Sequence, residues 1–197
     1  MNYLAHAYLS FRHPDILVGN MISDFVKGKQ QFSYAPGIWK GIRLHRLIDD
    51  FTDAHRVTRE ARQLFRPAVG LYAGAFMDVV YDHFLALDTN EIEEKEWQLF
   101  ATEVYSQLTA RQNSLPERFA RMLPYMSRQN WLYNYRYDWG VRRSFEGIAA
   151  RARYLDSSGE VFELFLEHYS LLKKAYAGFF PDVKNFARDE LAVLLKQ

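Results

Sequence analysis

Segment 70–87 constrains the fold more than any other part of the chain, because its residues are apolar nearly all the way round a helix. A helix with this pattern is buried on most of its sides. Helical periodicity dominates elsewhere, and strand-like alternation is scarce. We predict helices at about 2–11, 14–27, 37–53, 56–66, 70–87, 92–111, 116–127 and 140–153, followed by a helical stretch at 158–197 with a break at Pro181. The pattern therefore predicts an all-α fold, with one compact helical domain over residues 1–197.

Composition narrows the classes of function. The 197 residues suit one domain with a substantial core. Because 25 basic and 24 acidic residues leave a net charge of +1, a general nucleic-acid binder is disfavoured, although a local basic face can exist within a neutral total. The absence of cysteine excludes disulfides, thiolate metal sites and cysteine nucleophiles. With no secretory signal and no apolar run of about 20 residues, we expect a soluble cytoplasmic protein that does not enter the membrane.

Three of the apolar helices each carry a pair of polar residues with a spacing of four. The pairs are Asn20 and Asp24, His45 and Asp49, and Asp78 and Asp82. Residues four apart lie on one helix face, so both side chains of a pair can reach the same point. Each pair alone has a structural explanation, such as a local hydrogen bond at the edge of the core, a cap for a neighbouring segment, or an arginine partner.

The joint occurrence of the three pairs favours a shared site, because each unpaired buried polar group costs about 1–3 kcal/mol. A set of imidazole and carboxylate groups without sulfur suits Mn²⁺, Fe²⁺ or Mg²⁺ better than zinc. His6 joins such a site only if the amino-terminal helix packs against the other three. His83 points about 100° away from Asp82, so it either lines a neighbouring wall or is a core histidine.

Five stretches of the chain resemble the acyl carrier protein phosphodiesterase family. They are "MNYLAHAYLS", "GNMISDFVKG", "GIRLHRLIDDFTDAH", "FMDVVYDHFLA" and "RFARMLPYMSRQNWLYNYRYDWGVRRSFEGIAARAR", and they cover most of the chain in order. The resemblance implies an all-helical, metal-dependent fold similar to that of the HD phosphohydrolases. It also implies cleavage of the phosphodiester that joins 4′-phosphopantetheine to a serine of holo acyl carrier protein, usually with manganese.

On this resemblance, the family positions are His6, Asn20, Asp24, His45, Asp49, Asp78, Asp82 and His83. The adjacent His-Asp pair of the HD proteins is absent, and only a reversed pair occurs at Asp82–His83. The ligand set therefore cannot be copied from the HD proteins, and one or two metal ions remain possible.

Our hypothesis assigns the metal to four ligands, which are Asp24, His45, Asp49 and Asp78. The catalytic group then contains His6, Asn20, Asp82 and His83. Among these, His6 is also a possible fifth ligand, and a protonated His6 or His83 is the candidate proton donor for the serine oxygen.

An acidic carrier protein requires a basic docking face near the site. The candidate residues are Lys40, Arg43, Arg46, Arg56, Arg59, Arg62 and Arg66. A second candidate surface contains Arg136, Arg142 and Arg143. Taken by itself, the first group is better explained as a solvated helix face with routine ion pairs.

Two other functions stay open, together with the oligomeric state. The first is an HD-like hydrolase of nucleotides or other small phosphodiesters, which uses the same metal site without a docking face. The second is a helical protein-binding module that has lost catalysis. The aromatic stretch with Trp131, Tyr133, Tyr135, Tyr137 and Trp139 either packs a core, which we favour, or lines a pantetheine channel.

Overall fold

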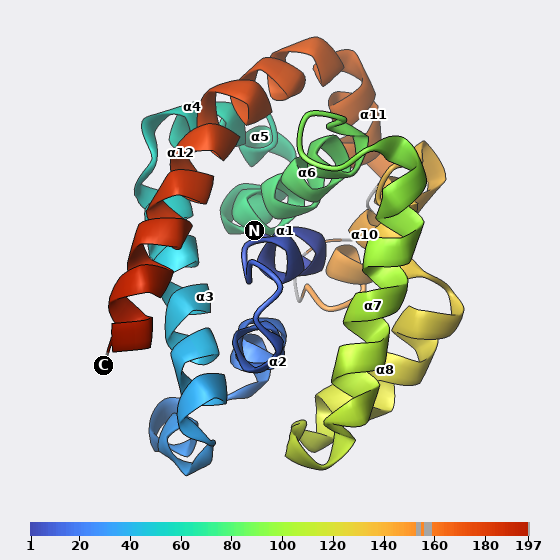
Figure 1. Ribbon diagram of the computed structural model, residues 1–197. Coiled ribbons are helices and arrows are strands. Elements are labelled where there is room, and N and C mark those ends of the chain that lie inside the picture. Colours follow the sequence, from blue (N-terminus) through green and yellow to red (C-terminus); the bar gives the residue numbers. More distant parts are fainter. Residues whose placement is uncertain (153–154, 156–158, 197) are drawn as a thin grey trace.

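Helices joined by short connections make up the computed structural model, which describes residues 1–152, 155 and 159–196 (Figure 1). The α-helices are α1 (Tyr3–Tyr8), α2 (Pro14–Ile22), α3 (Pro36–Ala54), α4 (Arg56–Arg62), α5 (Arg66–Val69), α6 (Ala73–Leu87), α7 (Trp97–Ala110), α8 (Glu117–Arg128), α9 (Trp131–Asn134), α10 (Asp138–Ala149), α11 (Gly159–Glu167) and α12 (Tyr169–Lys196). Short 3₁₀ turns are η1 (Ser23–Phe25), η2 (Gly28–Ser33), η3 (Gly70–Tyr72), η4 (Glu94–Glu96) and η5 (Gln112–Ser114). These described residues contain no strand, which confirms the all-α prediction. Among them, no helix combines the length and the apolar character needed to cross a membrane.

Three prolines lie at or near predicted helix boundaries, and the structure agrees with the prediction at one of them. α2 begins at Pro14 as predicted, since proline suits the first turn of a helix. The predicted single helix at 56–66 is wrong, because α4 ends at Arg62 and a second helix, α5, begins at Arg66. Pro67 lies in the first turn of α5, for the same reason as Pro14 in α2. The predicted break at Pro181 is also wrong, because α12 continues through this residue and the chain is interrupted at His168 instead. Burial of Phe179, Phe180 and Val183 holds α12 together across the proline, and Figure 1 shows the helix arching over the molecule before it runs beside α3.

Helix α6 is the centre of the core, as its apolar sequence predicts. Its side chains Phe76, Met77, Val79, Val80 and Tyr81 are fully buried. It packs against α1, α4, α10 and α12.

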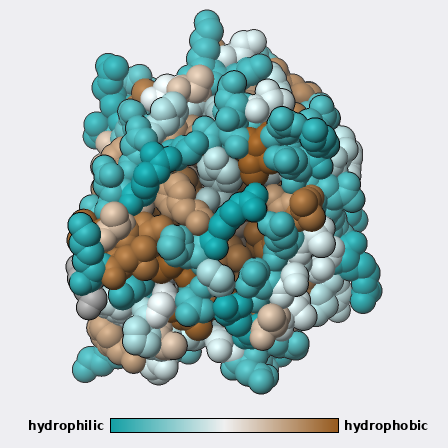
Figure 2. Space-filling model, in the orientation of Figure 1, coloured by the Kyte–Doolittle hydropathy of each residue, from teal (hydrophilic) through white to brown (hydrophobic). Residues whose placement is uncertain are grey.

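In Figure 1, α1 and α2 lie between α3 on one side and α7 on the other. Polar side chains cover most of the outer face that Figure 2 shows, and apolar side chains appear there in smaller patches.

Two glycines set the distance between α2 and α3. A Cβ atom on Gly19 would lie 2.0 Å from the Ile38 carbonyl oxygen, and one on Gly41 would lie 2.3 Å from the Ile16 carbonyl oxygen. Any other residue would therefore push the two helices apart. This close crossing places Asn20 of α2 beside His45 of α3, so that the two residues can form a hydrogen bond.

Candidate metal centre and adjoining cavity

Two helices bring together His6, His45 and Asp49, which we call the cluster. His6 comes from α1, and the other two residues come from α3. His6 Nε2 lies 3.2 Å from Asp49 Oδ1, and His45 Nε2 lies 3.0 Å from Asp49 Oδ2. The imidazole rings are stacked, with centroids 3.8 Å apart and an interplanar angle of 15°. One potential ligand atom from each residue lies within 4.8 Å of the others, so the three side chains can share one ion.

Asn20 orients both imidazoles. Its side-chain nitrogen donates to the His6 carbonyl oxygen at 2.8 Å and to Ser10 Oγ at 3.1 Å. Its Oδ1 is therefore the acceptor for His6 Nδ1, 2.8 Å away. His45 Nδ1 donates to the backbone oxygen of Asn20 at 2.7 Å. Because both Nδ1 atoms carry the hydrogen, both Nε2 atoms can present a lone pair toward Asp49.

The geometry of the cluster fits a divalent ion. His6 Nε2 is buried and has no hydrogen-bond partner among the described residues, and a bare lone pair that faces a carboxylate is repulsive unless a proton or a metal cation lies between them. Two ligands at right angles and about 2.1 Å from one ion are about 3 Å apart. The distances of 3.2 and 3.0 Å from Asp49 to the two imidazoles match this spacing. A set of two nitrogens and one carboxylate also suits the metals named from the sequence.

Electrostatics within the cluster favour a cation at His45. Burial alone would lower the pKa of His45, but hydrogen bonds to Asp24 and Asp49 raise it to about 9. Burial and the charge of His45 lower the pKa of His6. Burial alone would raise the pKa of Asp49, but the two imidazoles and the Met1 amino group lower it. The cluster therefore combines an ionised carboxylate with a position that attracts a proton or a metal ion.

The other two predicted ligands flank the cluster. Asp24 lies on η1, and its Oδ1 is 3.2 Å from His45 Nε2, with 69% of the side chain exposed. Asp78 Oδ1 lies 3.1 Å from the amino group of Met1, which is itself 3.4 Å from Asp49 Oδ1. Burial alone would lower the pKa of this amino group, but Asp78 and Asp49 raise it to about 10. Asp24 thus contacts the cluster directly, whereas Asp78 is linked to it through Met1.

Asp82 is placed as a helix cap. It accepts backbone N–H bonds from Asn2 at 3.3 Å, Leu4 at 2.7 Å and Ala5 at 3.2 Å, which fix the start of α1. Burial raises its pKa to about 7, although these N–H groups and the Met1 amino group oppose the shift. In the described part of the chain, no hydrogen bond or ion pair joins Asp82 to the cluster. Its contacts therefore support a structural task, and the catalytic role assigned from sequence stays a prediction.

His83 lies in the core between α9 and α12. Its Nδ1 donates to the Tyr135 carbonyl oxygen at 2.8 Å, and its Nε2 accepts from the Tyr169 hydroxyl at 2.9 Å. Burial lowers its pKa. These partners correspond to the core-histidine alternative, and none of the described contacts links His83 to the cluster. Its role as a proton donor stays a prediction.

Some of the predicted basic residues form ion pairs or hydrogen bonds, and others are exposed without such a partner among the described residues. Arg62 pairs with Asp53, Arg56 lies 3.8 Å from Glu60, and Arg46 donates to Gln31. Arg43, Arg59 and Arg66 are exposed, and Lys40 is half-buried. On the second surface, Arg136 pairs with Glu94, Arg142 lies over the Phe162 ring, and Arg143 faces a cavity. Within the described residues, no ion pair engages Arg59 or Arg66.

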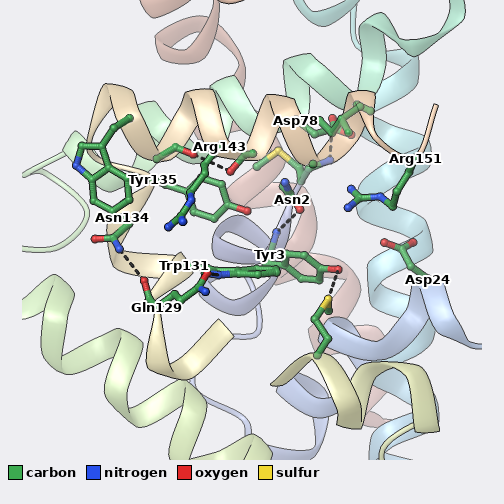
Figure 3. A pocket seen from close by; sticks show the side chains of 18 residues that line it. Asn2, Tyr3, Asp24, Asp78, Gln129, Trp131, Asn134, Tyr135, Arg143 and Arg151 are labelled. Carbon is green, nitrogen blue, oxygen red and sulfur yellow. Dashed lines mark hydrogen bonds and ion pairs between the residues drawn. The ribbon is translucent and has the colours of Figure 1, made fainter. Parts of the chain in front are cut away.

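A cavity of about 410 Å³ adjoins the cluster, and Asp24, Asp78 and Met1 line the part next to it (Figure 3). One face of α10 and the turn after it forms a wall with Gly140, Arg143, Ser144, Gly147, Ile148 and Arg151. The residues of the aromatic stretch divide between the cavity, the core and the surface. Trp131, Tyr135 and Trp139 line the cavity, Tyr133 packs against the core, and Tyr137 is exposed.

Ser10, the Met1 amino group and the wall of α10 were missed as functional elements in the sequence. The wall has a readable signal, since two glycines and a serine alternate with arginines at helical spacing. The other two have none, because their importance comes from contacts with distant helices.

Comparisons with known proteins show which family the chain is similar to. The family model described as acyl carrier protein phosphodiesterase matches residues 1–183. A protein of that name from Photorhabdus laumondii is 30% identical over 191 residues, which cover 96% of each chain. One from Salmonella agona is 32% identical over 182 residues, covering 92% of this chain and 94% of the relative. One from Klebsiella pneumoniae is 30% identical over 191 residues, covering 96% and 99%. No solved structure matches the chain, so the expected similarity to the HD phosphohydrolase fold stays a prediction.

Proposed function

Because the chain belongs to the acyl carrier protein phosphodiesterase family, we propose that it hydrolyses the phosphodiester between 4′-phosphopantetheine and the serine of holo acyl carrier protein. The products are apo acyl carrier protein and free 4′-phosphopantetheine. The observation that carries the proposal is the convergence of His6, His45 and Asp49 beside a cavity. The cytoplasmic location expected from the sequence stays a prediction.

The residues of the cluster would hold one divalent ion, which we propose to be manganese, the metal that the family resemblance implies. Nitrogen and carboxylate oxygen donors are compatible with that ion. Such an ion supplies an acidic bound water at neutral pH and neutralises a phosphate oxygen. Asn20 keeps both Nε2 atoms directed at the ion. Asp24 is the more exposed carboxylate beside the cluster, so it can accept a hydrogen bond from the attacking water. Asp78 adds negative charge on the cavity side.

The proposed activity predicts a loss of mass from the carrier protein. Purified enzyme, holo acyl carrier protein and Mn²⁺ should convert the carrier to its apo mass, because an ion held by His6, His45 and Asp49 would supply an activated water. A chelator should stop the conversion, and excess Mn²⁺ should restore it. Intact-protein mass spectrometry measures both species.

Other outcomes of the same assay identify the competing functions. An unchanged holo carrier together with rapid hydrolysis of bis(p-nitrophenyl) phosphate or a nucleotide would favour the small-phosphodiester hydrolase. No turnover of either substrate with Mn²⁺, Mg²⁺ or Fe²⁺ would favour the inactive binding module.

We also propose that α3, α4 and the start of α5 form the docking face for the acidic carrier protein. Exposed arginines on these helices attract an acidic partner and raise its rate of encounter. Arg43, Arg59 and Arg66 are suited to this role, since all three are exposed and unpaired among the described residues.

Charge reversal tests the docking face. The double variant Arg59→Glu and Arg66→Glu should raise KM for holo acyl carrier protein by about tenfold, because two attractive contacts become repulsive. Its turnover of bis(p-nitrophenyl) phosphate should not change. Arg118→Glu, an exposed residue of α8, is the control for charge alone. Steady-state kinetics with both substrates decide the matter, and equal losses on both would exclude a docking role.

A further inference from the structure

The cavity beside the cluster has the chemistry of a site for an extended amide chain, and we infer that it binds the pantetheine arm of the carrier protein. This inference rests on the proposed function. The volume of about 410 Å³ lies within the range of small-molecule sites. Because Asp24 and Asp78 line the part next to the cluster, a ligand in the cavity can place its phosphate at the metal centre.

The polar groups of the cavity match the order of groups along the arm. Figure 3 shows Asp24 and Asp78 on one side, Gln129 and Asn134 on the other, and Arg143 between them. The arm begins with a phosphate and continues through two amides to a thiol. Its phosphate end belongs at the cluster, so its amides lie near Arg143 and the two side-chain amides.

The hydrogen bonds of Gln129 and Asn134 leave one polar atom of each side chain available to bind the arm. Gln129 Oε1 accepts from Trp131, and Asn134 Nδ2 donates to the Gln129 carbonyl oxygen. These bonds fix the two side chains and leave Gln129 Nε2 and Asn134 Oδ1, a donor and an acceptor, for the amides of a ligand. The apolar atoms of the arm have Trp131, Met122 and Ile148 as neighbours in the lining.

Gly147 leaves the middle of the α10 wall of the cavity without a side chain. Among the residues that the structure describes, a Cβ atom at this position would meet only Arg151 Nη1, at 3.6 Å. The residue lies one turn from both Arg143 and Arg151 on the face of α10 that lines the cavity. A longer side chain at 147 therefore enters the cavity without touching the cluster, and this provides a selective block.

The test compares Gly147→Leu with Gly178→Leu. Gly178 is an exposed helical glycine of α12 whose Cβ would lie 3.9 Å from Val57 Cγ2, an ordinary contact, so both variants introduce the same side chain into a helix. Calorimetry measures the binding of free 4′-phosphopantetheine to the whole protein with Mn²⁺. We expect Gly147→Leu to weaken binding by at least about tenfold and to lower kcat/KM for holo acyl carrier protein equally, whereas Gly178→Leu should bind and react like the wild type.

A second variant protects the test against misfolding. Arg143 is exposed, so Arg143→Ala should fold normally and still weaken binding of 4′-phosphopantetheine. Wild-type affinity in both cavity variants, or no binding to any form, would overturn the inference. Failure of the proposed function has a separate signature, since the wild type would then bind 4′-phosphopantetheine in the cavity and leave holo acyl carrier protein intact.

Discussion

Replacing Asp49 with alanine should lower the release of 4′-phosphopantetheine by more than about a hundredfold and weaken Mn²⁺ binding in parallel. Loss of a supporting residue around a metal costs about 10–100-fold, and Asp49 is the residue that contacts both imidazoles of the cluster. Without its carboxylate, the two Nε2 atoms keep no shared anionic partner. Turnover is measured by the carrier mass assay, and Mn²⁺ binding by electron paramagnetic resonance.

Asp50→Ala is the matched control for this variant. Asp50 is the next residue of α3 and is exposed, so its loss removes the same charge from the same helix. We expect wild-type turnover and Mn²⁺ affinity for it. If Asp49→Ala behaves like Asp50→Ala, the cluster is not the metal site.

Asp82→Ala should lower the free energy of unfolding by about 2–4 kcal/mol, because three N–H groups at the start of α1 lose their acceptor. The N–H groups of Leu4 and Ala5 belong to buried residues, so water replaces the carboxylate poorly. Urea unfolding measures the change. Normal stability with lost turnover would return Asp82 to the catalytic group.

The stability of the wild type should also depend on pH through Asp82. Burial raises its folded pKa to about 7 from its ordinary value of 3.8. Between these values the folded state holds a proton that the unfolded state releases, so this group makes stability fall as the pH rises from about 4 to about 7. Asp82→Ala should lose this part of the pH dependence, which unfolding curves at several pH values can resolve.

Local patterns in the sequence predict part of the geometry of the cluster. His45 and Asp49 follow the rule that residues four apart on a helix meet, and they do so in α3. The same rule is incomplete for Asn20 and Asp24, because α2 ends at Ile22 and Asp24 lies on a 3₁₀ turn. Both residues nevertheless contact His45, since the glycine crossing of α2 and α3 brings their segments together.

Helical periodicity cannot predict the different contacts of Asp78 and Asp82. Both lie on α6 and share a face, but one pairs with the Met1 amino group and the other caps α1. Their different tasks depend on where the amino-terminal segment packs, which no local pattern in α6 reveals. The same limit explains His83, whose partners come from segments more than fifty positions away in the chain.

The central claim is that His6, His45 and Asp49 together hold a divalent ion, and anomalous scattering from crystals soaked in Mn²⁺ tests it directly. The account predicts a manganese peak bonded to His6 Nε2, His45 Nε2 and a carboxylate oxygen of Asp49. A peak at other residues, with His6 and His45 bonded only to protein atoms, would contradict it.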